Sequence, residues 1–173
     1  MYIIRAQLLE VSKPLVWRRF RCADDATFAE FHRKLVRAFG WLDYHLHEFR
    51  SSLEYDNAVV IGRAHDDDYW DGPPIDEELV QIQQVFSHTK KFYWIYDFGD
   101  DWQIELTCQK ESAEPASGIV RIGSSGKAPP EDCGGPDGFE RMKAVFRDDP
   151  DGEEAQRYRV WMGLKKGEEW SPR

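Results

Sequence analysis

Residues 91–109 read KFYWIYDFGDDWQIELTCQ, and this stretch decides the fold. Two runs rich in aromatic and β-branched residues flank Phe98-Gly99-Asp100-Asp101, a pattern typical of a β-hairpin. Gly99-Asp100 suits a type II′ turn with glycine at its first central position, which would pair residue 97 with residue 102. Because both faces of the hairpin are apolar, we expect a central position in a sheet that is covered on both sides.

The chain before the hairpin predicts a β-β-α-β start. Apolar runs at 3–11 and 16–22 are expected to form two strands joined by a turn. A helix then begins with the capping box Thr27-Phe28-Ala29-Glu30, keeps apolar residues at helical spacing, and ends at Gly40. A further strand is expected over 44–50, where apolar and polar residues alternate.

Between that strand and the hairpin the pattern is irregular. Residues 54–78 are acidic and rich in turn formers, so we expect a long excursion with one short strand near 59–61. Trp70 lies in this stretch, where an exposed aromatic side chain would suit a protein contact. Residues 79–86 fit either a helix or a strand.

Helices are expected at the C-terminus. Residues 123–138 predict a loop rich in proline and glycine, followed by one helix that ends before Pro150 and a second that ends at Gly163. The order of elements indicates a single α+β domain over residues 1–173, with a mixed or mostly antiparallel sheet and C-terminal helices.

Composition indicates a globular protein with an acidic surface. The 173 residues are 41% hydrophobic and carry 32 acidic against 23 basic side chains, a net charge of −9 that repels phosphate backbones. No apolar run approaches the roughly 20 residues that cross a bilayer, and a signal-peptide pattern is missing. The three cysteines are odd in number and outside any C-x-x-C pair, as in a reduced compartment. We therefore expect a cytoplasmic protein with no membrane association.

Four motifs resemble those of a known family. They are Trp17-Arg18-Arg19, residues 40–49 (GWLDYHLHEF), residues 96–102 (YDFGDDW) and residues 129–135 (PPEDCGG). In this order they resemble the plasmid pRiA4b open-reading-frame-3-like family, and the resemblance covers most of the chain. It implies a bacterial or archaeal protein linked to plasmids and insertion elements, and it implies no activity.

Two positions depart from the pattern of that family. Members commonly have a cysteine where this chain has Ala128, and a histidine where it has Ile104. Both differences remove soft metal ligands, so a cysteine and histidine metal site common to the family is not expected here.

The four motifs contain most of the candidate functional residues. Three acids around Gly99 exceed what a tight turn requires, and alternation sends His45 and His47 to one face of the strand expected next to the hairpin. We therefore expect one shared functional surface, formed by His45, His47, Asp97, Asp100, Asp101, Trp102, Glu131, Asp132 and Cys133. In the alternative interpretation, Asp97 and Asp132 are structural and accept backbone N–H bonds in turns and caps.

The same predicted surface contains candidate metal ligands and a candidate thiol nucleophile. His45 and His47, with nearby carboxylates and Cys133, are ligand types that zinc prefers, but they come from separate segments and His-x-His is common. We therefore predict no metal and no other cofactor. Cys133 is a candidate nucleophile near a possible helix start, although its acidic neighbours raise a thiol pKa.

A basic surface supplies another alternative. Residues 1–50 hold nine basic against six acidic side chains, and a nucleic-acid site would use Arg18, Arg19, Arg21, Arg33, Lys34 and Arg37. Ordinary solvated charge on the surface of these two elements is the favoured explanation, because the chain as a whole is acidic. The sequence favours a non-catalytic module that binds a protein, with nucleic-acid binding second and metal-dependent or thiol chemistry third.

Overall fold

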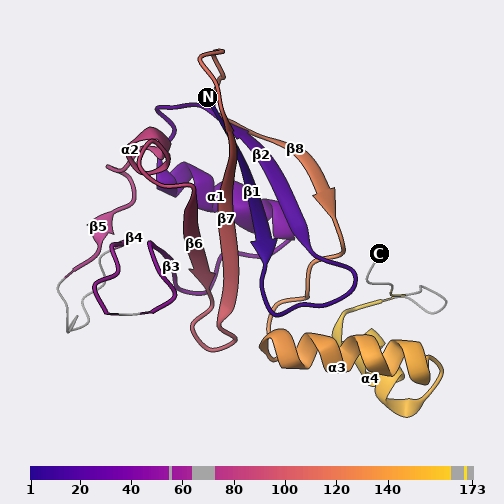
Figure 1. Cartoon of the computed structure of the whole chain (residues 1–173). Coiled ribbons are helices and arrows are strands. Elements are labelled where there is room, and N and C mark those ends of the chain that lie inside the picture. Colours follow the sequence, from indigo (N-terminus) through magenta and orange to yellow (C-terminus); the bar gives the residue numbers. More distant parts are fainter. Residues whose placement is uncertain (55, 64–72, 165–169, 171–173) are drawn as a thin grey trace.

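An eight-stranded sheet forms the centre of the computed structural model, which describes residues 1–54, 56–63, 73–164 and 170 (Figure 1). The strands are β1 (Tyr2–Leu8), β2 (Trp17–Cys22), β3 (His47–Arg50), β4 (Val60–Gly62), β5 (Ile75–Asp76), β6 (Lys91–Tyr96), β7 (Trp102–Glu111) and β8 (Ile119–Ser125), in the spatial order β5-β4-β3-β6-β7-β1-β2-β8. The helices are α1 (Phe28–Phe39), α2 (Ile82–Phe86), α3 (Gly135–Asp148) and α4 (Glu153–Trp161). Strands β4 and β5 pair in parallel and the other described pairs are antiparallel. The α+β class, the β-β-α-β start, the mixed sheet and the C-terminal helices are therefore confirmed.

Helix α1 covers one face of the sheet (Figure 1). It starts with the expected capping box, in which Thr27 Oγ1 accepts from the Glu30 N–H at 3.2 Å and Glu30 Oε2 accepts from the Thr27 N–H at 3.1 Å. It ends at Gly40, whose φ of 82° is left-handed. Its aromatic side chains pack onto the sheet, with Phe31 5.4 Å from the Phe20 ring of β2 and Phe28 4.8 Å from the Phe49 ring of β3. The apolar stripe of one helix thus closes the main core.

The hairpin pairs one residue away from the expected register. Tyr96 lies opposite Trp102, so the pairing of residue 97 with residue 102 and the two-residue turn are wrong. Five residues, 97–101, make the connection, and the Asp101 N–H donates to the Asp97 carbonyl at 2.6 Å. Asp97 and Asp101 both have left-handed backbone, with φ of 58° and 50°. Aspartate tolerates this conformation better than most residues, which permits the wider loop.

The register also decides which side chains are buried. A shift of one residue moves each side chain of a strand to the other face of its sheet. Trp94 and Ile104 therefore lie opposite each other on the buried face, whereas Tyr93 and Glu105 stay partly exposed on the other. The hairpin is central, as expected, but its second face is not fully covered.

Several bounds differ from the sequence expectation. Strand β1 ends at Leu8 rather than at residue 11, and the excursion holds two short strands, β4 and β5, rather than one. Strand β3 starts at His47 rather than at residue 44, so Tyr44, His45 and Leu46 precede the strand. Residues 119–125 form the edge strand β8, although 123–125 were expected in a loop. Only the first residue of β8 is buried, so no alternating apolar pattern marks it in the sequence.

Trp70 lies outside the described residues, so its expected exposure stays a prediction. Among the described residues, none of the helices has both the length and the apolar character needed to cross a bilayer.

Candidate functional site

Three segments meet at one end of the sheet: residues 41–47, the hairpin tip 97–101, and the loop 129–135. The buried Trp41 Nε1 donates to the Pro129 carbonyl at 2.9 Å. Glu131 joins the other two segments, because its carboxylate accepts from the Tyr96 hydroxyl at 2.5 Å and from the Leu42 N–H at 3.0 Å. These bonds hold together segments that are far apart in the sequence.

The loop 129–135 passes the hairpin tip at very close range. A Cβ atom on Gly135 would lie 2.5 Å from the Asp100 carbonyl oxygen, and Gly135 has a φ of 67°. Only glycine combines that backbone with that approach. Next to it, the Gly134 N–H donates to the Asp100 carboxylate at 3.2 Å. The second glycine of the motif is therefore required by contact between the loop and the hairpin.

We define the tip cluster as His45, Asp97 and Asp132, one residue from each of the three segments. His45 Nε2 lies 3.3 Å from Asp97 Oδ2 and 3.2 Å from Asp132 Oδ1. The other oxygen of Asp97 accepts from the Gly99 and Asp100 N–H groups, and the other oxygen of Asp132 accepts from the Tyr44 hydroxyl at 2.6 Å. One carboxylate oxygen of each aspartate thus has a structural partner, while the second faces the imidazole.

The other predicted site residues take different places. Trp102 is 1% exposed and belongs to the core, so it is not available to a ligand. Asp101 is exposed and accepts from Gln103. Cys133 is partly buried, and burial together with the Asp100 charge raises the pKa of its thiol to about 12. Cys133 therefore stays protonated at neutral pH, which removes the property that a nucleophile needs.

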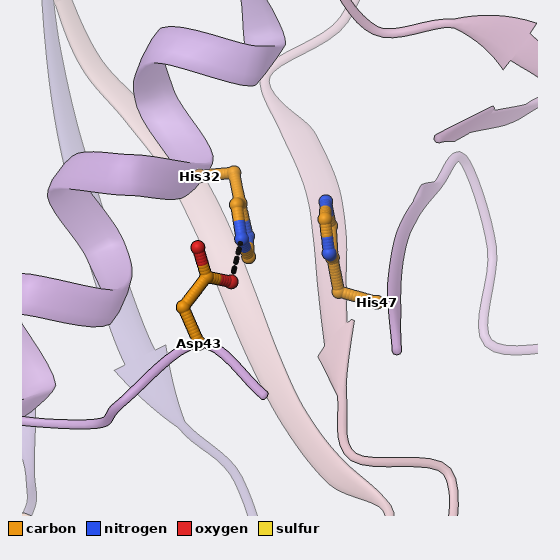
Figure 2. Close-up of side chains that lie close together, drawn as sticks. All are labelled: His32, Asp43 and His47. Atoms are coloured by element: carbon orange, nitrogen blue, oxygen red, sulfur yellow. Dashed lines mark hydrogen bonds and ion pairs between the residues drawn. The ribbon is translucent and has the colours of Figure 1, made fainter. Parts of the chain in front are cut away.

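His47 contributes to a second cluster, which we call the buried histidine cluster: His32, Asp43, His47 and Glu77. His32 Nε2 lies 2.6 Å from Asp43 Oδ1, and His47 Nε2 lies 2.8 Å from Glu77 Oε2. Figure 2 shows the two imidazoles face to face, His32 reaching from α1 and His47 from the neighbouring strand. Their ring centroids are 3.3 Å apart and their planes differ by 5°.

Charges in this cluster are strongly influenced by burial. Burial and the neighbouring His47 lower the pKa of His32 to about 4, so the ring is neutral at pH 7. Glu77 is fully buried, and burial alone would raise its pKa. The hydrogen bond and charge of His47, with help from His32 and Arg63, hold the pKa of Glu77 below its usual value instead. Two carboxylates therefore approach a pair of stacked imidazoles inside the protein.

The structure places His45 and His47 of the predicted shared surface in different side-chain clusters. His45 lies in the tip cluster and His47 in the buried histidine cluster, because the strand begins only at His47 and the preceding residues do not alternate in a sheet. Sequence reasoning also missed His32, Asp43 and Glu77. His32 follows Phe28 by four residues, so the sequence already places this histidine on the apolar face of α1, where its burial could have been predicted.

The predicted basic surface is divided. Arg18 is 6% exposed and donates to the carbonyl oxygens of Trp17, Ala38, Ser125 and Gly126, so it is a structural residue. Arg19 and Arg21 alternate with it and point to the sheet face opposite α1. The remaining three residues, Arg33, Lys34 and Arg37, lie on α1 itself and line a shallow groove beside Gly118 and Ile119. The sheet therefore separates the two exposed groups.

Comparison with known proteins identifies the family. The profile of the plasmid pRiA4b ORF-3-like proteins matches residues 1–173. The chain belongs to this family. An uncharacterised family relative, protein y4hQ of Sinorhizobium fredii, is 30% identical over 143 residues, which cover 81% of this chain and 70% of the relative.

A solved structure supports the same fold for the plasmid pRiA4b ORF-3-like chain. The crystal structure of MM3350, a protein of unknown function from Methanosarcina mazei Go1, is similar with a TM-score of 0.80 and 28% identity. The match covers 99% of this chain and 91% of that one. The four motifs thus predicted the family correctly, and the names of these relatives assign no activity.

Proposed function

We propose that this family member is a non-catalytic, cytoplasmic binding module that captures a partner protein at the end of the sheet where the tip cluster lies. The observation that carries the proposal is a set of large apolar side chains exposed beside the acidic groups. Leu42 is 74% exposed and Phe98 is 48% exposed, and Tyr44 and Leu46 are similarly accessible. Large exposed apolar side chains beside polar groups are typical of protein interaction sites.

The two exposed segments are held next to each other. The Asp97 N–H donates to the Leu46 carbonyl at 2.9 Å, which joins the hairpin tip to residues 42–46. The Tyr44 hydroxyl is bonded to Asp132, so its ring is positioned before any partner arrives. Such preorganisation lowers the entropy cost of association.

The charges indicate the chemistry of the partner. Asp97, Asp100, Asp101, Glu131 and Asp132 all lie in the segments that meet here. A partner segment that alternates basic and apolar side chains would place its cations near these carboxylates and its apolar groups on the exposed rings and leucines. We therefore propose a basic, apolar segment of a protein as the ligand.

The division of the basic residues argues against nucleic acid. A duplex or a single strand needs cations along one continuous surface, whereas Arg19 and Arg21 lie on one side of the sheet and Arg33, Lys34 and Arg37 on the other. The raised pKa of Cys133 argues in the same way against thiol chemistry.

Binding of short synthetic peptides tests the proposal. We expect peptides that alternate arginine with leucine or phenylalanine to bind the full chain, and acidic peptides of the same apolar content not to bind. Asp97→Asn keeps the oxygen that accepts from Gly99 and Asp100 but removes the charge, so the protein should fold while peptide affinity falls by about tenfold or more. Fluorescence anisotropy gives both affinities.

Control variants distinguish binding at this surface from non-specific binding to exposed apolar side chains. Phe98→Ser should weaken peptide binding, whereas Val160→Ser should not, because Val160 is 71% exposed on α4 and equally apolar. Peptide binding that is indifferent to Asp97→Asn and Phe98→Ser contradicts the proposal. Salt-sensitive binding of single- or double-stranded DNA, lost when Arg19 and Arg37 become glutamate, would favour the nucleic-acid alternative instead.

A further inference from the structure

The buried histidine cluster contains a polar group that the protein leaves without a partner. His32 is fully buried, and its Nδ1 atom has no hydrogen-bond partner among the described residues. A buried acceptor without a partner destabilises the folded protein, so such atoms are rare unless something else satisfies them. We propose that this cluster binds a divalent transition metal ion of the zinc class through His32, Asp43 and His47.

The three side chains supply a ligand set that suits such an ion. One ligand atom from each lies within 4.8 Å of the other two. In a tetrahedral zinc site with metal–nitrogen distances near 2.0–2.1 Å, neighbouring ligand atoms are about 3.3 Å apart. An ion bound by all three would draw these atoms to that separation, which requires rotation of the Asp43 side chain and a tilt of the two rings. Two imidazoles and a carboxylate are typical ligands of zinc in proteins.

The ring geometry points the same way. Aromatic pairs prefer centroid separations of about 4.5–7 Å, whereas His32 and His47 lie 3.3 Å apart and nearly parallel. Two imidazoles gain little from such a stack, and two imidazolium ions would repel each other. A cation at the rim of the stack, where Figure 2 shows Asp43 beside His32, gives both rings a common partner.

Glu77 prepares His47 for this role. A carboxylate only accepts, so His47 Nε2–H donates a hydrogen bond to Glu77 Oε2 at 2.8 Å, which leaves Nδ1 as the ring nitrogen that can bind an ion. Glu77 Oε1 in turn accepts from Arg63 Nε at 3.0 Å. A buried carboxylate that holds the far nitrogen of a histidine is the usual second partner of a metal-binding imidazole. Glu77 is thus a positioning residue.

The charge balance also favours a cation. Asp43 and Glu77 each place a carboxylate against one of the two rings, and the Arg63 guanidinium contacts Glu77. A divalent ion offsets the carboxylate charge and turns the lone pairs of the two rings into bonds. Asp43 is the most exposed of the three ligands, with 37% of its side chain accessible to water.

A bound ion would connect helix α1 to the segment that leads to the exposed residues. His32 lies on α1, whereas Asp43 and His47 flank Tyr44 and Leu46. An ion held by all three fixes both ends of that segment to the helix. The inference is independent of the proposed function, because metal binding is measured without any partner. Of the His45 and His47 pair that the sequence offered as joint ligands, it uses only His47.

Titration with Zn²⁺ and Co²⁺ tests the inference. The full chain is stripped with a chelator and then titrated with Zn²⁺ against a competing chromophoric dye. We expect one ion per chain, a dissociation constant in the micromolar range or tighter, and a higher midpoint of thermal unfolding with Zn²⁺. Co²⁺ should give visible absorption bands of a nitrogen and oxygen ligand set without the sulfur charge-transfer band that Cys133 would cause. An absence of stoichiometric binding by the wild-type chain overturns the inference.

Matched variants locate the ion. Asp43 has a φ of 64°, and asparagine tolerates that backbone, so Asp43→Asn should fold and bind Zn²⁺ at least about tenfold more weakly. Asp132→Asn is the control, because Asp132 belongs to the tip cluster and has a similar φ of 56°. Weaker Zn²⁺ binding in Asp132→Asn with unchanged binding in Asp43→Asn would move the ion to the tip cluster and overturn the inference. His32→Gln should abolish the Co²⁺ spectrum, and a spectrum that persists in the folded variant would also contradict it.

Discussion

His45 and His47 are two residues apart, yet they belong to regions with opposite access to water. In the tip cluster, Asp132 is 56% exposed and His45 is partly open, and Asp97 alone is buried. In the buried histidine cluster, His32 and Glu77 are fully buried and His47 nearly so. The same residue types, imidazole and carboxylate, thus lie in high and low effective dielectric within one short segment.

The difference decides what each region can do. Water screens the exposed Asp132 carboxylate, so its contact with His45 contributes little to folding and remains available to a partner. In the buried histidine cluster the same groups interact strongly, and each needs a partner that water does not supply. The open region suits reversible protein binding, whereas the buried region suits a tightly held ion.

Removal of one carboxylate from each region sharpens the comparison and gives the largest expected effect. Glu77→Ala leaves His47 and Arg63 without their buried partner, so the free energy of unfolding should fall by about 3–5 kcal/mol. Asp132→Asn removes an exposed charge, keeps a side chain that tolerates the φ of 56°, and should cost less than about 1 kcal/mol. Urea denaturation followed by tryptophan fluorescence measures both. Equal losses in the two variants would show that burial does not separate the regions.

A pair of glycine variants tests how tightly the open region is built. Gly135→Ala should destabilise the protein by roughly 3 kcal/mol, because a left-handed alanine costs about 1–2 kcal/mol and the new Cβ also meets the Asp100 carbonyl. Gly134 has a φ of 88° but no closer neighbour than 3.6 Å, so Gly134→Ala should cost only the conformational part. The difference between the two midpoints in urea measures the contact between loop and hairpin. Identical midpoints would mean that the loop yields without penalty.

The smallest expected effect concerns Cys133. At pH 8 a thiol with a pKa of about 12 has roughly a thousandfold less thiolate than one with the ordinary value of about 9. Alkylation of the folded chain by iodoacetamide should therefore be slow at Cys133 and become fast in denaturant, with the sites read by mass spectrometry. Cys133→Ser should leave peptide binding unchanged. Rapid labelling of Cys133 in the folded chain would contradict the raised pKa and support Cys133 as a nucleophile.

Local signals were sufficient for some elements. The capping box at Thr27, the apolar spacing along α1 and the left-handed Gly40 specify one helix with contacts no more than four residues apart, so its bounds were predicted closely. The same holds for the existence of the β6–β7 hairpin, because two β-rich runs flank a short polar segment. The four motifs were likewise enough to predict the family.

Only the tertiary structure decided the register of the hairpin and the membership of the two clusters. Five tip residues replace the expected two-residue turn because Asp97 and Asp101 take left-handed backbone and Gly135 packs against Asp100, a contact across 35 positions of sequence. His32 meets His47 because α1 crosses the strand that follows it, and Glu77 arrives from the far side of the long excursion. Periodicity assigns a side chain to a face of its own element, whereas the partner across that face depends on how separate elements pack.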